Sequence, residues 1–386
     1  MRTKNDLDTS FEQWKRGIEK LIREHPLHII SWEATRQCDM NCVHCGSPSE
    51  EVNLGDELTT EEVIAAFQQI AADFDMSQFR HINITGGEPF VRKDLISILK
   101  EISSIPFYRN IDIQTNGLFI HDNPVILKEL KKYGVTGVGI SIDGMEKTHD
   151  SFRRMAGSFF KTVKAAKLAV ENGYVVTVST VAHAKNVVEL PELLDIVKSE
   201  IRPRVFRVMT IDPLGRTGVE SEYLLSPDNV KEVIDFLKLE YQNSCKAYGD
   251  SSTTMVELGC GGWLGKELEG TFRPLIFHCI AGINNLGILF DGKLASCSNI
   301  SRDFIEGDLR KDRIKNVWEN RYRKYRELEW KKTGFCKTCD QWSFCHGGPM
   351  HRRDLYEYVG LCIFNELRTC HTKLISENLQ SKKITC

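Results

Sequence analysis

The front half of this chain alternates short strand-like segments with helical ones, and this alternation restricts the fold more than any other feature. Strands that alternate with helices predict parallel βα units. Six units are too few for a closed eight-stranded barrel, so we expect an α/β fold with a curved, partly open (β/α)6 TIM-like barrel. The six strand segments span residues 27–35, 80–85, 110–115, 137–143, 174–180 and 204–210.

Local signals support the helices between these strands. Thr59 and Glu62 have the spacing of a capping box at the start of a helical segment over residues 58–74. Gly173 is a suitable C-cap for a helix over residues 158–172. The segment before the first strand predicts an amphipathic helix.

The composition excludes several classes of protein. The net charge of −2 gives no excess of positive charge for binding nucleic acid. No apolar run approaches the roughly 20 residues needed to span a membrane. The N-terminal segment also lacks the apolar core of a signal peptide. We therefore expect a cytoplasmic protein with no nucleic-acid partner and no membrane span.

The 13 cysteines are unevenly distributed. Three lie at residues 38–45, and the others lie between Cys245 and Cys386. Disulfides are rare in a reducing compartment, so metal ligation is the leading interpretation. The pattern predicts one metal site in the front half and separate metal sites in the back half.

Cys38, Cys42 and Cys45 follow the first strand segment, at the end of the barrel where ligands bind. Structural zinc takes four ligands, and no fourth ligand is obvious nearby. A 4Fe-4S cluster that only carries electrons also takes four thiolates. Three thiolates leave one iron open to a substrate. We therefore favour an iron–sulfur cluster and keep zinc as the alternative.

Further motifs follow later strands. After the second strand, residues 86–89 read Gly-Gly-Glu-Pro; the glycines allow a close backbone approach, and Glu88 presents an acceptor. After the fourth strand come Ser141 and then Arg153, whose guanidinium can clamp a carboxylate through two parallel hydrogen bonds. An ordinary turn and a solvent-exposed helix arginine are the plain alternatives.

The order and spacing of these motifs resemble those of radical S-adenosylmethionine (radical SAM) enzymes over residues 28–215. The resemblance implies that Cys38, Cys42 and Cys45 hold three irons of a 4Fe-4S cluster, and that the fourth iron chelates S-adenosylmethionine. It implies one-electron cleavage to a 5′-deoxyadenosyl radical that abstracts hydrogen from a substrate. It also implies a reductant such as flavodoxin or ferredoxin. It does not identify a catalytic acid or base.

The resemblance further implies the protein contacts of this cofactor. The Gly-Gly-Glu-Pro segment would contact the methionine amino group, mainly through its backbone. Ser141 and Arg153 would contact the ribose and carboxylate, and Leu214 would lie along the adenine. The cofactor-binding residues expected in this way are Gly86, Gly87, Glu88, Pro89, Ser141, Arg153 and Leu214.

The back half carries a second set of cysteine spacings. Cys279 precedes Gly292 by thirteen positions, and Cys297 follows at the end of a segment that predicts a β-hairpin turning at Asp291-Gly292. The pair Cys336 and Cys339 alone could be half of a zinc ribbon. Together the spacings resemble the SPASM extension of radical SAM enzymes, which binds auxiliary iron–sulfur clusters. The ligands implied for one or two auxiliary 4Fe-4S clusters are Cys260, Cys279, Cys297, Cys336, Cys339, Cys345 and Cys362.

This resemblance divides the chain into three parts. We expect an N-terminal amphipathic helix over residues 1–27, a radical SAM partial barrel over residues 28–240, and a small, cysteine-rich SPASM domain over residues 241–386.

One position departs from the SPASM pattern. A cysteine is expected four residues after Cys345, and Pro349 stands there. By analogy, Cys336, Cys339, Cys345 and Cys362 complete one cluster, whereas Cys260, Cys279 and Cys297 lack a fourth thiolate. An open iron, His346, His351 or Cys370 could fill that place, and a cluster with fewer irons is a further alternative.

Enzymes with a SPASM extension mostly modify peptides or proteins, so the resemblance implies a crosslink, an oxidation or an epimerisation. Ser298 follows Cys297 where sulfatase-maturing relatives carry an aspartate, which counts against that activity. Some 27 residues precede the first strand, too few for a leader-binding domain. A separate leader-binding protein could supply that domain, or the substrate could be a larger protein. The alternatives are a small-molecule substrate, such as a sugar, amine or tetrapyrrole, and a non-enzymatic electron carrier.

Overall fold

The computed structural model describes residues 4–47, 54–246, 253–269, 276–353 and 362–368. Within them, one sheet contains ten strands. The strands are β1 Ile29–Glu33, β2 His81–Thr85, β3 Ile111–Thr115, β4 Val135–Ser141, β5 Val175–Ala182, β6 Val205–Thr210, β7 Met255–Leu258, β8 Asn285–Ile288, β9 Lys293–Ala295 and β10 Gly307–Asp308.

The α-helices alternate with the strands in the first half of the chain. They are α1 Lys4–Glu24, α2 Thr60–Asp73, α3 Leu95–Ser104, α4 Leu118–Asp122, α5 Ile126–Lys132, α6 Glu146–Arg153, α7 Ser158–Glu171, α8 Leu190–Ile196, α9 Pro227–Lys246, α10 Ile314–Asn320, α11 Arg323–Arg326 and α12 Trp342–Cys345. No helix in these parts of the chain is long and apolar enough to cross a membrane.

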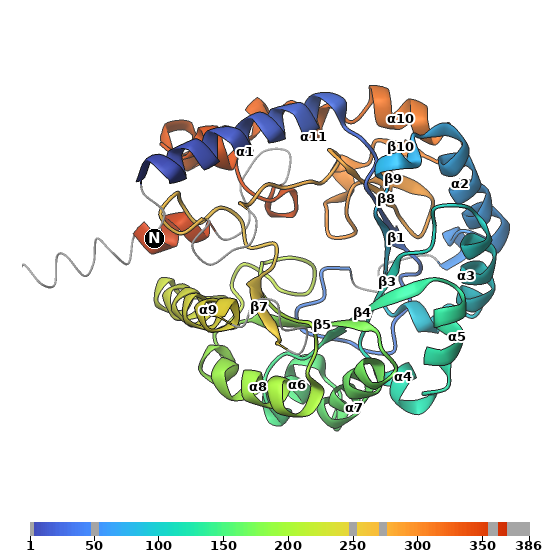
Figure 1. The fold of residues 1–386 in the computed structure, drawn as a ribbon, viewed down its shortest axis with the longest axis horizontal. Helices are drawn as coiled ribbons and strands as arrows, with labels where there is room; N and C mark the ends of the chain where they lie inside the picture. Colours follow the sequence, from blue (N-terminus) through green and yellow to red (C-terminus); the bar gives the residue numbers. More distant parts are fainter. Residues whose placement is uncertain (1–3, 48–53, 247–252, 270–275, 354–361, 369–386) are drawn as a thin grey trace, which may run out of the picture.

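The sheet curves into a partly open barrel with helices on its outer side (Figure 1). Its strand order is β10-β9-β8-β1-β2-β3-β4-β5-β6-β7. All neighbours from β8 to β7 are parallel, whereas β9 and β10 pair antiparallel. The predicted barrel of six βα units is confirmed as β1 to β6. The strands β7 and β8 extend it by one parallel strand on each side, which the sequence pattern did not predict.

The strand β8 connects the two halves of the chain. It pairs in parallel with β1, with Leu286 opposite Ile30, and β1 pairs on its other side with β2, where Ile82 lies opposite Ile30. The predicted domain boundary at residue 240 falls inside α9, and one sheet contains strands from both sides of it. The division into three domains therefore stays a prediction.

The predicted local signals are present in the structure. The Thr59 hydroxyl accepts the backbone N–H of Glu62 at 3.2 Å, and the Glu62 carboxylate accepts the backbone N–H of Thr59 at 2.9 Å, which completes the capping box of α2. Gly173 follows the end of α7 with a φ of 74°, a conformation that favours glycine. Gly292 has a φ of 81° in the turn between β8 and β9, so the predicted hairpin is confirmed.

The helix α1 packs against the cysteine-rich half of the chain. The Phe11 ring meets Trp263 and Phe344 edge-on, with centroids 6.0 and 5.9 Å apart. Trp14 lies against the same two rings. These aromatic rings form a small core of their own, separate from the main one. The predicted N-terminal helix thus covers the C-terminal part of the molecule.

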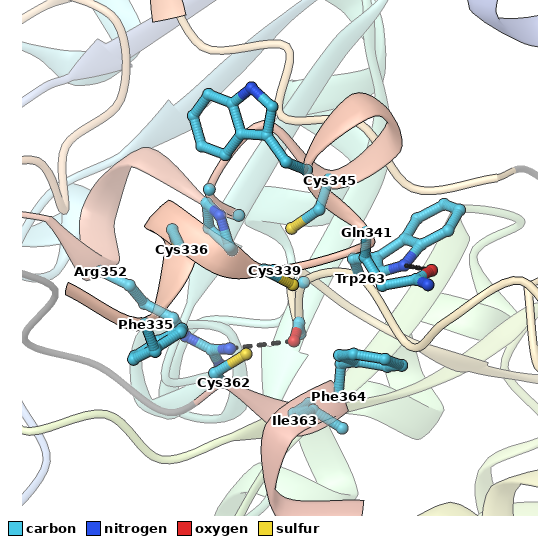
Figure 2. A pocket seen from close by; sticks show the side chains of 16 residues that line it. Trp263, Phe335, Cys336, Cys339, Gln341, Cys345, Arg352, Cys362, Ile363 and Phe364 are labelled. Atoms are coloured by element: carbon cyan, nitrogen blue, oxygen red, sulfur yellow. Dashed lines mark hydrogen bonds between the residues drawn. The ribbon is translucent and has the colours of Figure 1, made fainter. Parts of the chain in front are cut away.

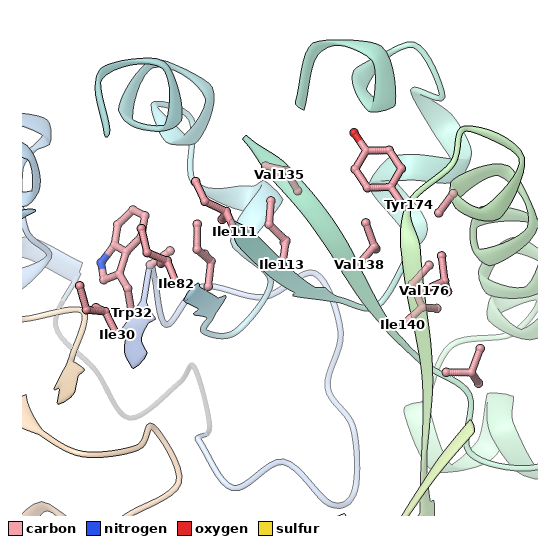
Figure 3. Packing of buried hydrophobic residues seen from close by; sticks show 14 of the residues in the cluster. Ile30, Trp32, Ile82, Ile111, Ile113, Val135, Val138, Ile140, Tyr174 and Val176 are labelled. Carbon is pink, nitrogen blue, oxygen red and sulfur yellow. The ribbon is translucent and has the colours of Figure 1, made fainter. Parts of the chain in front are cut away.

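The main core lies between the sheet and its outer helices. Alternate strand residues, such as Trp32 on β1 and Ile113 on β3, point toward the helices and are fully buried (Figure 3). Phe67 of α2 meets the ring of Trp32 edge-on at 6.0 Å and the ring of Tyr108 at 5.4 Å. The residues between these on each strand, such as Asp112, therefore face the concave side of the sheet.

We expect Phe67→Ala to destabilise the fold by about 3–5 kcal/mol, because it opens a cavity between α2 and the sheet. The measurement is the urea unfolding midpoint of the metal-free protein, followed by circular dichroism. Phe160→Ala is the matched control, because that ring is 60% exposed on α7 and its loss should change stability by less than about 0.5 kcal/mol. Equal effects of the two substitutions would contradict this account of the core.

Candidate functional site

Cys38, Cys42 and Cys45 lie in the loop that leaves the carboxyl end of β1. The loop after β6 holds this segment, since Arg216 donates its backbone N–H to Cys45 O (3.0 Å) and its Nη1 to Cys42 O (3.2 Å). Burial raises the pKa of the Cys38 thiol to about 12 and also raises that of Cys42. Each of these two thiols is further affected by the charge of another cysteine of the group, so the sulfurs lie near one another. Iron binding would release their protons.

The two glycines after β2 lie directly against the backbone that leads into the cysteine loop, and they do not face an open space. Gly87 donates its N–H to Thr35 O and Glu88 donates to Gln37 O, both at 2.8 Å. A Cβ on Gly86 would lie 2.3 Å from Thr35 O, and a Cβ on Gly87 would lie 2.1 Å from Gln37 O. Only glycine permits this approach of the two backbones. Their predicted contact with the cofactor stays a prediction.

Glu88 connects this turn to the end of β3. Its carboxylate accepts the Thr115 hydroxyl at 2.8 Å and the backbone N–H of Asn116 at 2.7 Å. The side chain is buried, and burial raises its pKa to about 7 despite these hydrogen bonds. The Asn116 amide in turn donates to Asp39 in the cysteine loop at 2.6 Å. Pro89 is buried at the start of a short 3₁₀ helix, Pro89–Val91.

Arg153 is buried, with 6% of its surface exposed, so it is not a solvated helix arginine. Its Nε and one terminal nitrogen contact the same Asp143 oxygen at 2.9 and 2.7 Å. Burial opposes the charge on Asp143, but the guanidinium outweighs it and holds the pKa of that carboxyl below its usual range. The charges of Cys42 and Cys38 also act on Arg153, so a fixed cation lies near the thiols. Its contact with a cofactor carboxylate stays a prediction.

The sequence analysis missed one residue at this site, His44, whose side chain is 17% exposed. The His44 ring, between the second and third cysteines of the motif, stacks on Phe152 with centroids 4.4 Å apart. Its Nε2 lies 3.7 Å from the Asp143 carboxylate. Burial lowers the pKa of His44 to about 4, so the ring is neutral near pH 7. The position of His44 inside the cysteine motif was the signal that could have indicated it.

Ser141 and Leu214 lie at the same edge of the barrel as the cysteines. Ser141 is the last residue of β4 and pairs with Ser179 of β5. Leu214, in the loop after β6, contacts the cysteine loop, because a Cβ on Gly46 would lie 3.8 Å from the Leu214 Cβ. The fold therefore brings the predicted cofactor residues around one loop, while their individual contacts stay predictions.

Four of the back-half cysteines line one pocket (Figure 2). Two buried cations accompany them: Arg353 donates to Cys336 Sγ at 3.0 Å, and Lys331 Nζ donates to Gly348 O at 2.6 Å. Aromatic rings, including Trp263 and Trp342, close the sides of the pocket. The four cysteines are Cys336, Cys339, Cys345 and Cys362.

Cys260, Cys279 and Cys297 form a separate group. Burial raises the pKa of Cys297 to about 12, and the charges of Cys260 and Cys279 add to this shift. The backbone N–H of Met350 lies 3.5 Å from Cys279 Sγ. Pro349 packs against Gly262, where an added Cβ would lie 3.3 Å from the proline ring. The turn that carries Pro349 therefore borders this group, and the assignment of these cysteines as cluster ligands stays a prediction.

The two histidines considered as a fourth ligand lie in different places. The His351 ring hydrogen-bonds with the Cys260 thiol and with Asp212. His346 instead lies 6.0 Å, ring to ring, from both His278 and Trp342. Cys370 lies outside the described residues.

The donors at these sites are mainly thiols. In the described parts of the chain, no three His, Cys, Asp or Glu side chains converge closely enough to hold one metal ion. The donor sets, which are rich in thiols and largely desolvated, suit iron–sulfur clusters.

Comparison with known families now decides the assignment. Residues 32–197 match the radical SAM superfamily, and residues 279–340 match the SPASM iron-sulfur cluster-binding domain. The chain therefore contains a radical SAM domain followed by a SPASM domain. The two domains occur in the predicted order, so this radical SAM enzyme binds a 4Fe-4S cluster with S-adenosylmethionine and auxiliary iron–sulfur clusters.

Named relatives of this radical SAM enzyme differ in their chemistry. An AdoMet-dependent heme synthase of Methanosarcina barkeri is 26% identical over 330 residues, which cover 83% of this chain and 90% of the relative. The mycofactocin maturase MftC of Mycobacterium tuberculosis is 28% identical over 345 residues, which cover 88% of this chain and 81% of the relative.

Solved structures share the fold. The AdoMet-bound form of anSMEcpe has a TM-score of 0.67 at 17% identity, covering 92% of this chain and all of that protein. AdoMet-bound SuiB of Streptococcus suis has a TM-score of 0.63 at 17% identity, covering 90% of this chain and 79% of SuiB. At this level of identity the likeness concerns the fold alone.

We expect Gly87→Ala to lower the iron content of the radical cluster several-fold, because the methyl group would push the cysteine loop away from the turn after β2. Iron and sulfide are to be counted after anaerobic reconstitution. Gly218→Ala is the control, since nothing lies within 4 Å of the Cβ it would add. Normal loading of the Gly87→Ala protein would show that the two backbones can separate without harm.

Replacing Cys38, Cys42 and Cys45 together by Ala should remove about four irons per chain and abolish formation of 5′-deoxyadenosine, because these thiolates anchor the radical cluster. The auxiliary clusters should survive, and their absorption and paramagnetic resonance spectra are the internal control. Continued cleavage of S-adenosylmethionine by this triple variant would refute the assignment of the three cysteines.

Proposed function

We propose that this radical SAM enzyme modifies a peptide or protein, by forming a crosslink, oxidising a residue or epimerising one. The observation that carries this proposal is that the concave face of the barrel is polar. The cysteine loop lies at the carboxyl end of this face. A peptide offers donors and acceptors along its backbone, so a surface that binds it needs both kinds of group.

The concave face supplies both kinds of group and both signs of charge. Gln114 of β3 donates to the Asn83 side chain of β2 at 3.0 Å. Across the barrel, Arg207 of β6 pairs with Glu257 of β7 at 2.7 Å. Asp112 and Arg207 keep 37% and 38% of their side chains exposed, so these charges are accessible. An apolar, flat substrate would displace water from these exposed charges without replacing it, at a cost in free energy.

The comparisons add support for a peptide. The structure of anSMEcpe with a Cp18Cys peptide has a TM-score of 0.65, and that of SuiB with its precursor peptide SuiA has a TM-score of 0.63. A separate leader-binding protein, and a flavodoxin or ferredoxin as reductant, belong to this proposal as partners.

A small-molecule substrate is the second candidate. The identity of 26% with the heme synthase extends over most of both chains. A GTP 3′,8-cyclase of Aquifex aeolicus is also 26% identical, over 81% of this chain. Relatives of similar length are therefore named either for reactions of small molecules or as maturases.

The residues of the site have different roles in the proposed reaction. When bound, the cluster and S-adenosylmethionine supply a 5′-deoxyadenosyl radical that abstracts hydrogen from the substrate. Arg153 places a buried positive charge near Cys38 and Cys42, where it stabilises thiolates. Glu88 and the glycines fix the cysteine loop, and the concave face orients the substrate below it.

The test is anaerobic coexpression with small proteins encoded near its gene, followed by intact mass and chiral amino-acid analysis. A loss of two hydrogens, or an unchanged mass with one residue of inverted configuration, is the expected result. The triple cysteine variant is the control and should leave every peptide unmodified. Turnover of a small molecule, with no peptide changed in mass or configuration, would overturn the proposal in favour of the second candidate.

A further inference from the structure

The turn Met350–Arg352 borders the group formed by Cys260, Cys279 and Cys297. Met350 directs its backbone N–H to Cys279 Sγ at 3.5 Å, and the side chain of the next residue, His351, hydrogen-bonds with the Cys260 thiol. One short turn therefore contacts two of the three cysteines. Only 14% of the His351 side chain is exposed.

A buried carboxylate fixes the His351 ring. Its Nε2 lies 3.3 Å from Asp212, and the same carboxylate pairs with Arg352 at 2.8 Å. Arg352 is anchored in turn, because it donates to Gly261 O at 2.9 Å and to the Thr210 hydroxyl at 2.7 Å. A histidine that ligates a metal commonly donates its other ring nitrogen to a carboxylate, which fixes the tautomer and the orientation of the ring.

We propose that His351 is the fourth protein ligand of the auxiliary iron–sulfur cluster held by Cys260, Cys279 and Cys297. The inference rests on the binding of auxiliary clusters by this chain and not on the choice of substrate. The ring would bind iron as a neutral imidazole, through one of its two nitrogens.

The competing donors have weaker positions. His346 lies beside His278 and Trp342, next to the other cysteine group. Pro349 carries no side-chain donor and packs against Gly262. His351 therefore takes the role that a cysteine at position 349 would have had, from two residues further along the same turn.

A histidine ligand has a physical consequence. A neutral imidazole in place of a thiolate makes the cluster less negative, and histidine ligation raises the reduction potential of iron–sulfur centres. This auxiliary cluster should therefore accept an electron more readily than the one held by Cys336, Cys339, Cys345 and Cys362.

The test uses the full chain with Cys38, Cys42 and Cys45 replaced by Ala, so that only auxiliary clusters remain. The protein is reconstituted anaerobically, reduced, and studied by pulsed paramagnetic resonance with natural and ¹⁵N-labelled histidine. We expect an imidazole nitrogen coupling on one auxiliary cluster, which changes when the label is introduced. Absence of this coupling in the protein with His351 intact would overturn the proposal, and an open iron, Cys370 or a cluster with fewer irons would remain as the alternatives.

Two variants locate the nitrogen. His351→Cys should abolish the coupling, keep the iron content and lower the midpoint potential of that one cluster, because it restores a fourth thiolate. His346→Ala is the matched control and should keep the coupling. A coupling that survives in His351→Cys, or disappears in His346→Ala, would refute the assignment. No substrate enters these measurements, so their outcome is independent of the test of peptide modification.

Discussion

The structure depends on the pairing of β1 with a strand on each side. β2 comes from the front half of the chain and β8 from the back half, and both run parallel to β1. The loop that leaves the carboxyl end of β1 carries Cys38, Cys42 and Cys45. The expected ligands of the radical cluster therefore directly follow the strand that joins the two halves of the chain. Cys297 follows the hairpin of β8 and β9, which places an auxiliary ligand on the neighbouring strand connection. The distance between the two cofactor regions is thus fixed by backbone hydrogen bonds.

Buried charge is compensated wherever the cofactor regions require it. Asp143 and Arg153 are both nearly inaccessible, and each would be costly alone in a medium of low polarity. Together they form an ion pair, and at Cys42 the lowering of the pKa by Arg153 is larger than its raising by Asp143. Lys331 plays a similar part in the back half: burial lowers its pKa to about 8, and the charges of nearby cysteines oppose that effect. The protein therefore places cations beside its thiol groups before any iron is bound.

Much of the fold and of the candidate sites could be predicted from the sequence, because the responsible interactions are local or depend on residues at fixed sequence spacings. Strands β1 to β6, the capping box at Thr59 and the turn at Gly292 follow from short-range propensity. Strands β7 and β8 were not predicted as barrel strands, because four-residue segments join the sheet only through partners distant in sequence. The two glycines after β2 looked like a ligand loop, yet they also meet the backbone of the cysteine loop, which no local pattern reveals. The pairing of Arg153 with Asp143 is likewise a tertiary contact.

The loop after β6 shows how the two cofactor regions can influence each other. Asp212 opens this loop and holds His351 beside Cys260, while Arg216, four residues later, holds Cys42 and Cys45 through their carbonyl groups. Leu214 lies between them, with its N–H bonded to Asp212 O. A change in charge at the auxiliary cluster acts first on the His351–Asp212 pair, and a displacement of Asp212 would move the loop that supports the radical cluster. Because tightly packed segments transmit small shifts rather than absorb them, this loop is a direct structural link between the two cysteine regions.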